Sequence, residues 1–204
     1  MSDTFLDRVY AARTAAETRA LYDAWSASYD AEISAQGYVT PGRCAEALRA
    51  HMSDPTQPIL DFGCGTGLSG LALALAGFTT LDGVDLSAEM LEGARAKGVY
   101  RDLARIEADQ PLRHAPGTYA AIAAIGVIGA GAAPISVFDT LMEGLATGGL
   151  LVFSFNDHAL QDPANEAKLA EWTDSGRARE RFRDYGPHLT GMNLNSCVYI
   201  VEKT

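Results

Sequence analysis

The stretch DFGCGTGLSG, residues 61–70, has the residue types and spacing best suited to hold a small ligand. Counted from Gly65, the glycines at Gly65, Gly67 and Gly70 form the G-x-G-x-x-G pattern that brings a backbone turn close to a dinucleotide phosphate. Counted from Asp61, the same stretch is an acidic residue followed by G-x-G-x-G, which favours a cationic ligand. The two interpretations predict different chemistry.

A second acid, Asp85 in LDGVDLS, stands twenty residues after Gly65, where both interpretations expect a carboxylate that binds a ribose. Asp61 is the residue that discriminates. A carboxylate about 4 Å from a phosphate is repelled by roughly 4 kcal/mol at an effective dielectric constant of about 20. The sulfonium and ammonium groups of S-adenosylmethionine would instead be attracted. The loop therefore favours that cofactor over a nicotinamide dinucleotide.

Two further residue types fit the same ligand. Gly63 and Gly65 lack Cβ atoms, so the turn can lie flat against the methionine portion and the adenosine. Met90, five residues beyond Asp85, falls near the start of the next helix, where its thioether can lie against adenine. The alternative for Met90 is an ordinary core methionine.

These residues need a scaffold, and the rest of the sequence predicts an α/β one. Residues 4–52 have a helical pattern with an aromatic stripe of Tyr22, Trp25 and Tyr29. After the prolines of DPTQP, short apolar runs alternate with helical stretches, as in βαβ units. The expected strands are Ile59–Phe62, Thr79–Val84, Ala104–Ala108, Tyr119–Ile125 and Leu150–Phe155, with a last one in SCVYIVEK.

Between the strands, Gly77 can end the helix that follows the glycine loop, and another helix opens after Pro134. A polar helix is expected at about residues 164–183. We predict one structural domain, with an N-terminal helical cap over residues 1–53 and a ligand-binding domain over residues 54–204.

Composition excludes several classes of partner. The formal net charge of −10 offers no broad basic face, so no nucleic-acid partner is expected. The three widely spaced cysteines, without a C-x-x-C pair, favour reduced thiols in a cytoplasmic protein and indicate no metal site. The uncharged segment 115–138 is broken by glycine and proline, and the N-terminus has no secretion signal, so no membrane association is expected.

The motifs ILDFGCGTG, LDGVDLSAEML, GTYAAI and LATGGLLVFSF, in this order and spacing, resemble those of class I S-adenosylmethionine-dependent methyltransferases. YDAWSASYD and ARAKGVYRDL are similar, more narrowly, to the small methyltransferases related to the one encoded in the Williams-Beuren critical region. The resemblance implies a Rossmann-like, doubly wound, mostly parallel seven-stranded sheet. It also implies methyl transfer to a small-molecule acceptor that the sequence does not identify.

The resemblance also implies site residues. It assigns the cofactor loop to Asp61, Gly63, Gly65 and Gly67, the ribose hydroxyls to Asp85, the adenine face to Met90, the adenine amino group to Asp109 and the methionine end to the backbone at Gly126. Ala120 and Ala132 stand where relatives have an aspartate and often a histidine. Any role that the aspartate and the histidine have in those relatives is therefore missing from this chain.

No residue is a clear catalyst, and the weak candidates are Tyr22, Tyr29 and His158. The tyrosines lie on the helix expected to fold over the cofactor, where their hydroxyls could reach the cofactor or the substrate. His158, in FSFNDH after the fifth strand, could act as a general base or could be a solvent-exposed loop residue. His188 is a similar candidate, with His51 and His114 behind it.

Two other patterns have simpler explanations. Ser87 is expected to cap the helix that follows Asp85. The four arginines of GRARERFRD, at positions 177, 179, 181 and 183, would be solvated on a helix but would share one face of an extended segment, where they could bind an acidic substrate. The alternatives to a methyltransferase are a catalytically silent cofactor-binding protein and an NAD-dependent oxidoreductase.

Overall fold

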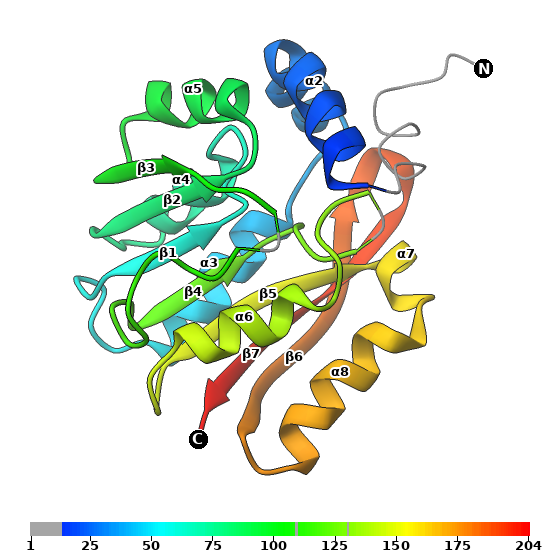
Figure 1. Cartoon of the computed structure of the whole chain (residues 1–204). Coiled ribbons are helices and arrows are strands. Elements are labelled where there is room, and N and C mark those ends of the chain that lie inside the picture. Colours follow the sequence, from blue (N-terminus) through cyan, green and yellow to red (C-terminus); the bar gives the residue numbers. More distant parts are fainter. Residues whose placement is uncertain (1–13, 109, 130) are drawn as a thin grey trace.

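The protein is described by a computed structural model that covers residues 14–108, 110–129 and 131–204. Its core is a seven-stranded sheet with the order β3-β2-β1-β4-β5-β7-β6 (Figure 1). Strands β1 to β5 are parallel, and β7 pairs antiparallel with both β5 and β6. The predicted fold class is confirmed. The strands are β1 Ile59–Phe62, β2 Leu81–Asp85, β3 Asp102–Arg105, β4 Ala121–Ala124, β5 Leu150–Asn156, β6 Ala178–Leu189 and β7 Leu194–Lys203.

The central strands are apolar because helices cover both faces of the sheet. Every residue of β1 and of β4 is buried. The parallel register places Ile59 of β1 beside Leu81 of β2 and Ala121 of β4. The carboxyl ends of these strands therefore meet at one edge of the sheet, which is where such sheets bind ligands.

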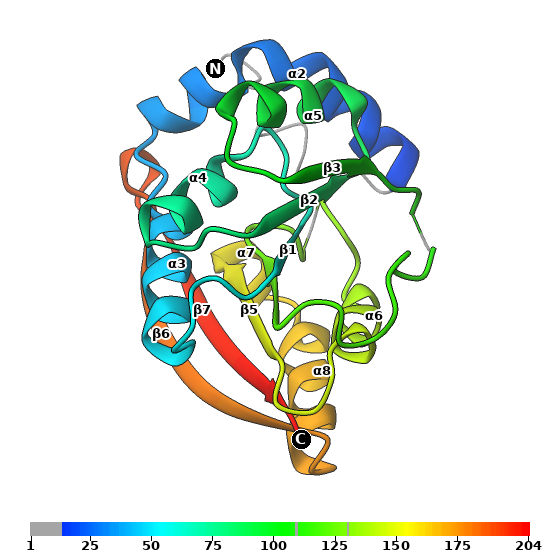
Figure 2. The same cartoon turned by 90° about the vertical axis from the view of Figure 1, so that its left-hand side faces the viewer.

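Helices cover both faces of the sheet (Figure 2). Leu48 of α3 and Leu73 of α4 are buried in the core on one face, and Phe138 of α6 and Trp172 of α8 in the core on the other. The helices are α2 Ala15–Ala35, α3 Thr40–His51, α4 Leu68–Leu75, α5 Ala88–Lys97, α6 Val137–Gly144, α7 Asp157–Leu160 and α8 Pro163–Asp174, with a 3₁₀ turn η1 at Thr190–Met192.

The N-terminal helical region consists of α2 and α3, because the chain turns at residues 36–39, where Gly37 has φ 65°. Residues 1–13, which were also predicted as helical from residue 4, lie outside the described part. Helix α3 packs on the sheet in the same core as α4. Helix α2 lies apart from that layer and packs beside α5 (Figures 1 and 2). The division at residue 53 stays a prediction.

The polar helix expected at residues 164–183 is correct in its first part and wrong in its second. Helix α8 ends at Asp174, and β6 begins at Ala178. Strand β6 lies at the edge of the sheet, so most of its residues are exposed and it lacks the apolar alternation of an ordinary strand. Three of the four arginines in the stretch GRARERFRD form ion pairs. Arg177 pairs with Glu171, Arg181 with Glu202, and Arg183 with both Glu166 and Glu180.

These ion pairs satisfy three of the four arginines within the chain, which removes the main reason to assign the group an acidic substrate. Among the described helices, none has the length and apolar character needed to cross a membrane. The uncharged segment 115–138 is instead divided between coil, the buried strand β4 and the start of α6.

Candidate functional site

The glycine loop connects β1 to α4, and its glycines serve three different purposes. Gly63, Gly65 and Gly67 all have positive φ angles, of 70°, 53° and 89°. A Cβ on Gly63 would lie 2.6 Å from Val127, and one on Gly67 would lie 3.1 Å from the Cα of Ala94 on α5. A Cβ on Gly65 would meet no atom within 4 Å. Gly63 and Gly65 line the main cavity, whereas Gly67 is not among its lining residues and lets α4 approach α5.

Asp61 lies at the end of β1, beneath this loop, with no exposed surface. Its Oδ2 accepts hydrogen bonds from the Ser69 hydroxyl at 2.6 Å and the Tyr100 hydroxyl at 2.7 Å. Its Oδ1 is buried without a hydrogen-bond partner among the described residues. Burial raises the pKa of Asp61 to about 6, the charge of Asp85 adds to this, and the two hydroxyls oppose it. An unpaired carboxylate oxygen below the loop suits a cationic ligand above it.

Asp61 does not itself line the cavity. The predicted contact with the cationic end of a ligand therefore stays a prediction, and in this structure Asp61 also holds the loop in place. Tyr100 strengthens that role because its hydroxyl also accepts the Gly70 N–H at 3.1 Å.

Asp85 ends β2 and lines the cavity. Its Oδ2 accepts the Gly65 N–H at 2.8 Å, and its Oδ1 accepts the Ser87 N–H at 2.9 Å. Burial raises the pKa of Asp85, against the backbone hydrogen bonds, which lower it. Each oxygen keeps a further lone pair, so the carboxylate can accept hydrogen bonds from two neighbouring hydroxyls, as a ribose requires.

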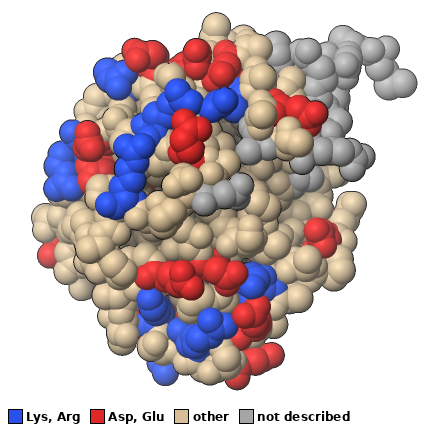
Figure 3. Space-filling model, viewed as in Figure 1, with Lys and Arg blue, Asp and Glu red and all other residues tan. Residues whose placement is uncertain are grey.

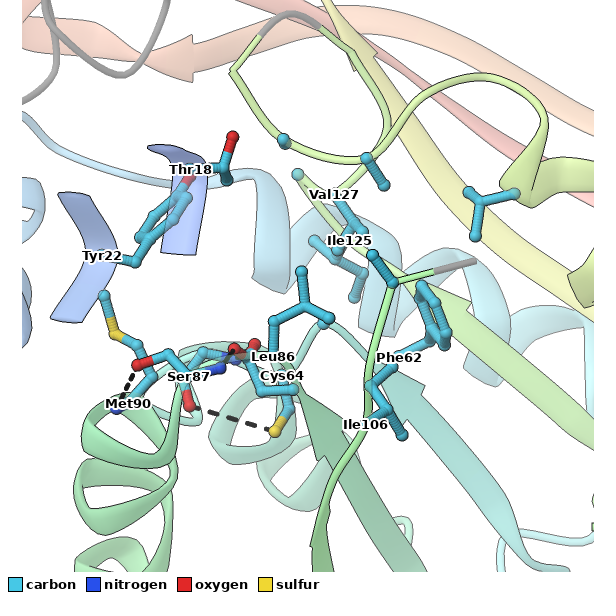
Figure 4. A pocket seen from close by; sticks show the side chains of 18 of the residues that line it. Thr18, Tyr22, Phe62, Cys64, Leu86, Ser87, Met90, Ile106, Ile125 and Val127 are labelled. Atoms are coloured by element: carbon cyan, nitrogen blue, oxygen red, sulfur yellow. Dashed lines mark hydrogen bonds between the residues drawn. The ribbon is translucent and has the colours of Figure 1, made fainter. Parts of the chain in front are cut away.

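Met90, Leu86 and Ile106 contribute apolar side chains to the wall of the cavity (Figure 4). Ser87 caps α5, as predicted, by accepting the Met90 N–H at 3.0 Å. This places Met90 in the first turn of α5, with 1% of its surface exposed, at the edge of the cavity together with Leu86 and Ile106. The wall fits a flat aromatic ligand. Asp109, which was predicted to bind the adenine amino group, lies outside the described residues.

Helix α2 covers the cavity from the opposite side, and Figure 4 shows Thr18 and Tyr22 facing Ser87 and Met90 across it. Tyr22 and Tyr29 both line the cavity. Trp25, between them on α2, is 1% exposed and packs against both tyrosine rings, at centroid distances of 6.0 and 4.6 Å. The burial of Trp25 indicates a packing role.

Two ion pairs join α2 to the body of the protein. Lys97 of α5 binds Asp30 at 2.6 Å, and Arg19 binds Glu107 in the segment after β3 at 3.3 Å. The second pair spans the cavity rim, because Arg19 and Glu107 both line it.

Gly126, after β4, also lines the cavity, with φ 70°. Its N–H donates to the Ser154 hydroxyl at 3.0 Å, and a Cβ here would lie 2.6 Å from the Tyr38 hydroxyl. The Tyr38 hydroxyl therefore leaves no room for a side chain at Gly126. The predicted backbone role of Gly126 is compatible with this position and remains a prediction.

The cavity has a volume of about 1000 Å³, at the upper end of the usual range for small-molecule sites. No sequence motif predicts the second half of this cavity. That half lies between the coil after β3 and helix α6, and its lining includes Leu112, Pro116, Val137, Thr140 and Glu143.

The four histidine candidates occupy different places, and His51 lies away from the cavity, with its Nδ1 2.8 Å from the Ala47 carbonyl oxygen. His158 is exposed on α7 and is not among the residues that line the cavity. His114 lines the cavity and lies 3.3 Å from the Tyr119 hydroxyl. His188 is buried and borders a small side chamber. The structure therefore gives no geometric support to His158 as a base. Among the described residues, no cluster of histidine, cysteine and acidic side chains could hold a metal ion.

Gly65 allows a direct test of the ligand loop. We expect Gly65→Ala to lower the free energy of unfolding by about 1 to 2 kcal/mol, because a left-handed backbone disfavours a side chain, and to weaken S-adenosylhomocysteine binding at least tenfold. Gly77→Ala is the matched control, since Gly77 also has a positive φ angle and open space around it but lies after α4, outside the cavity lining. Thermal unfolding and calorimetric titration measure both effects. Equal losses of affinity in the two variants would contradict the placement of the ligand at Gly65.

The site fits S-adenosylmethionine in three respects. Asp85 presents acceptors for a ribose, Gly65 leaves an open backbone surface, and the unpaired Oδ1 of Asp61 adds negative charge below the loop. The same carboxylates would repel the pyrophosphate of a dinucleotide.

Comparisons with known proteins agree with this chemistry. A family model described as a methyltransferase domain matches residues 39–196, which is more than half of the chain. Human methyltransferase-like protein 27 is 35% identical over 123 residues, 59% of this chain and 50% of the human protein, so the chain spans about half the length of that relative.

Solved structures share the fold at low sequence identity. A methyltransferase of Methanosarcina mazei, described as S-adenosylmethionine-dependent, matches with a TM-score of 0.62 and 15% identity over 77% of this chain and 96% of its own. A chain in the complex between the Haloferax volcanii Trm112 methyltransferase activator and a methyltransferase matches with a TM-score of 0.65 and 15% identity, over 89% and 97%. The family match shows that this chain belongs to the methyltransferase domain family, and the solved structures share its fold.

Proposed function

We propose that the chain transfers the methyl group of S-adenosylmethionine to a small-molecule acceptor. The observation that carries this proposal is the continuous cavity of about 1000 Å³ that begins at Asp85 and the glycine loop and extends past them to α6. The cofactor residues occupy one end. The remaining volume is available for an acceptor.

The bound cofactor supplies an electrophilic methyl group on a positively charged sulfur. The chain's own residues bind and orient it: Asp85 accepts hydrogen bonds from the ribose hydroxyls, Gly63 and Gly65 expose backbone to the methionine portion, and Met90 packs on the adenine. Tyr22 and Tyr29 close the cavity on the side of α2 and keep water out. Alignment of the reactants can provide most of the acceleration, so a strong base is not required for every acceptor.

Helix α2, which covers the cavity, favours a small acceptor over a macromolecule. Helix α2 is fastened to the body of the protein by two ion pairs, Lys97 with Asp30 and Arg19 with Glu107. On the face shown in Figure 3, acidic and basic side chains lie next to each other among the described residues. Such a mixed surface, with the net charge of −10, does not suit a nucleic-acid substrate.

We further propose that the chain belongs with the small methyltransferases related to the one encoded in the Williams-Beuren critical region. The support for this is the stretch YDAWSASYD, which forms the part of α2 that carries Tyr22, Trp25 and Tyr29 over the site.

Methyl-labelled S-adenosylmethionine tests the proposed function. The protein is incubated with it and with a cell extract separated into small-molecule and macromolecular fractions. We expect label in a product of low mass from the first fraction, at a rate that Asp85→Ala abolishes. Label in protein or nucleic acid would contradict the small-molecule acceptor, and cofactor binding without turnover in either fraction would indicate a catalytically silent binding protein.

A further inference from the structure

A small chamber of about 60 Å³, roughly the volume of two water molecules, adjoins the main cavity. The two spaces share the walls formed by Tyr22, Tyr29, Tyr38 and Gly126. The far wall of the chamber contains polar side chains that do not line the main cavity, namely Ser154, Asn156 and His188. No acidic or basic side chain other than His188 lines the chamber among the described residues.

His188 is 6% exposed, and its ring contacts the Tyr38 ring edge-on at 5.2 Å. Its Nδ1 lies 2.8 Å from the Thr40 hydroxyl. Its Nε2 has no hydrogen-bond partner among the described residues. Because His188 lines the chamber, an imidazole nitrogen without such a partner is available to a ligand there.

The proton on this ring can be placed by following a chain of hydrogen bonds. Arg43 Nη1, which can only donate, lies 3.0 Å from the Ser196 hydroxyl oxygen, and that oxygen lies 2.9 Å from the Thr40 hydroxyl. If Ser196 donates to Thr40 and Thr40 donates to His188, every hydroxyl proton has an acceptor. The reverse direction would leave the buried Ser196 proton unsatisfied. His188 Nδ1 is therefore an acceptor, and Nε2 carries the hydrogen.

The ring is also neutral at physiological pH. Burial lowers the pKa of His188 to about 4, Asp157 opposes this, and the charges of Arg43 and His158 reinforce it. A neutral ring with a fixed tautomer is a hydrogen-bond donor, not a base.

Ser154 supplies a second donor to the same space. Its oxygen accepts the Gly126 N–H, and its own hydroxyl proton has no acceptor among the described residues. Two neutral donors in a chamber without a carboxylate complement a ligand oxygen.

We propose that the chamber binds a carbonyl or carboxylate oxygen of the methyl acceptor, with His188 Nε2–H as the donor. This inference rests on the proposed function. The acceptor is favoured over the cofactor as the source of that oxygen because Ser154, Asn156 and His188 line only the chamber and lie on β5 and β6, whereas Asp85 ends β2.

Nitrogen-15 NMR of the imidazole side chains tests the tautomer and the binding together. The protein is saturated with S-adenosylhomocysteine and titrated with acetate, which fits the chamber, and separately with ethylammonium, a cation of similar size. We expect His188 to be protonated at Nε2 and its Nε2–H signal to shift with acetate but not with ethylammonium. A proton on Nδ1, or equal responses to the two probes, would overturn the inference.

Two variants keep the test decisive. Thr40→Val removes the hydroxyl that fixes the tautomer, and we expect a mixture of tautomers with acetate affinity reduced at least threefold. His188→Phe should abolish the acetate response, seen at the Gly126 amide, and leave affinity for both S-adenosylhomocysteine and 5′-methylthioadenosine, which lacks the amino-acid portion, within twofold of wild type. A loss confined to S-adenosylhomocysteine would assign the chamber to the cofactor's carboxylate and overturn the inference. Failure of the wild type to bind S-adenosylhomocysteine would instead contradict the proposed function.

Discussion

Asp85→Ala is expected to weaken S-adenosylhomocysteine binding at least tenfold and as much as several hundredfold. The carboxylate lies in the cavity wall, and hydrogen bonds from ribose hydroxyls to a charged acceptor contribute about 1.5 to 3 kcal/mol each, less what water recovers. The substitution also releases the Gly65 and Ser87 N–H groups that the carboxylate now accepts. Calorimetric titration gives the affinity, and thermal unfolding shows whether the variant is folded.

Glu89→Ala is the matched control for the loss of a negative charge in this region. Glu89 lies in the first turn of α5, exposed, and is not among the residues that line the cavity. We expect its affinity to stay within twofold of wild type. If the two variants lost affinity equally, the effect would be long-range electrostatics and the assignment of Asp85 to the ribose would be wrong.

Asp61→Asn is expected to change stability and binding in opposite directions. Burial raises the pKa of Asp61 from 3.8 to about 6 in the folded protein. Below about pH 4 the carboxyl is neutral in both the folded and the unfolded state. As the pH rises from about 4 to about 6, the unfolded state loses this proton while the folded state keeps it, so stability falls until the folded carboxyl also ionises. Asparagine is neutral throughout, so the variant should gain about 2 to 3 kcal/mol relative to wild type between pH 4 and pH 7.

Binding should fall in the same variant. An unpaired negative oxygen below the glycine loop attracts the ammonium of S-adenosylhomocysteine, and its removal is expected to cost on the order of tenfold in affinity. The stabilised fold and the weakened binding would together identify Asp61 as a charge kept for the ligand at the expense of stability.

Asp82→Asn provides a control of opposite sign for the stability measurement. Burial alone would raise the pKa of Asp82, but hydrogen bonds from Arg101 and Tyr119 lower it below its ordinary value. This variant should therefore be less stable than wild type, by a difference that develops as the pH rises toward the ordinary pKa of 3.8 and stays constant above it. Chemical denaturation at pH 4, 5.5 and 7 distinguishes the two cases. Parallel curves for Asp61→Asn and wild type would contradict the buried charge.

The cofactor end of the cavity could be predicted because its residues are close in sequence to the ends of two apolar strands. The loop after β1 and the acid at the end of β2 are local patterns, and Ser87 caps α5 within three residues of Met90. Asp61 was found for its charge, but its burial beneath the loop depends on Ser69 and Tyr100, and no local pattern shows that contact.

The rest of the site was missed for identifiable physical reasons. Strand β6 is polar because it lies at an exposed edge, so its sequence resembles that of a surface helix. His188 of β6 contacts Thr40 of α3, which is 148 residues away in the sequence. This contact depends on where the pairing with β7 places β6. The acceptor half of the cavity brings the coil after β3 against α6, a contact that only the order of the strands creates.

Calorimetric titration of the wild-type protein with S-adenosylhomocysteine and, separately, with NAD tests the central claim most directly. The negative charge of Asp61 and Asp85 around the glycine loop favours the first ligand and opposes the second. We expect binding of S-adenosylhomocysteine with a micromolar or lower dissociation constant, and no measurable heat from NAD at about 1 mM, a concentration that would reveal binding of roughly −4 kcal/mol. Binding of NAD that is tighter than that of S-adenosylhomocysteine would contradict the account.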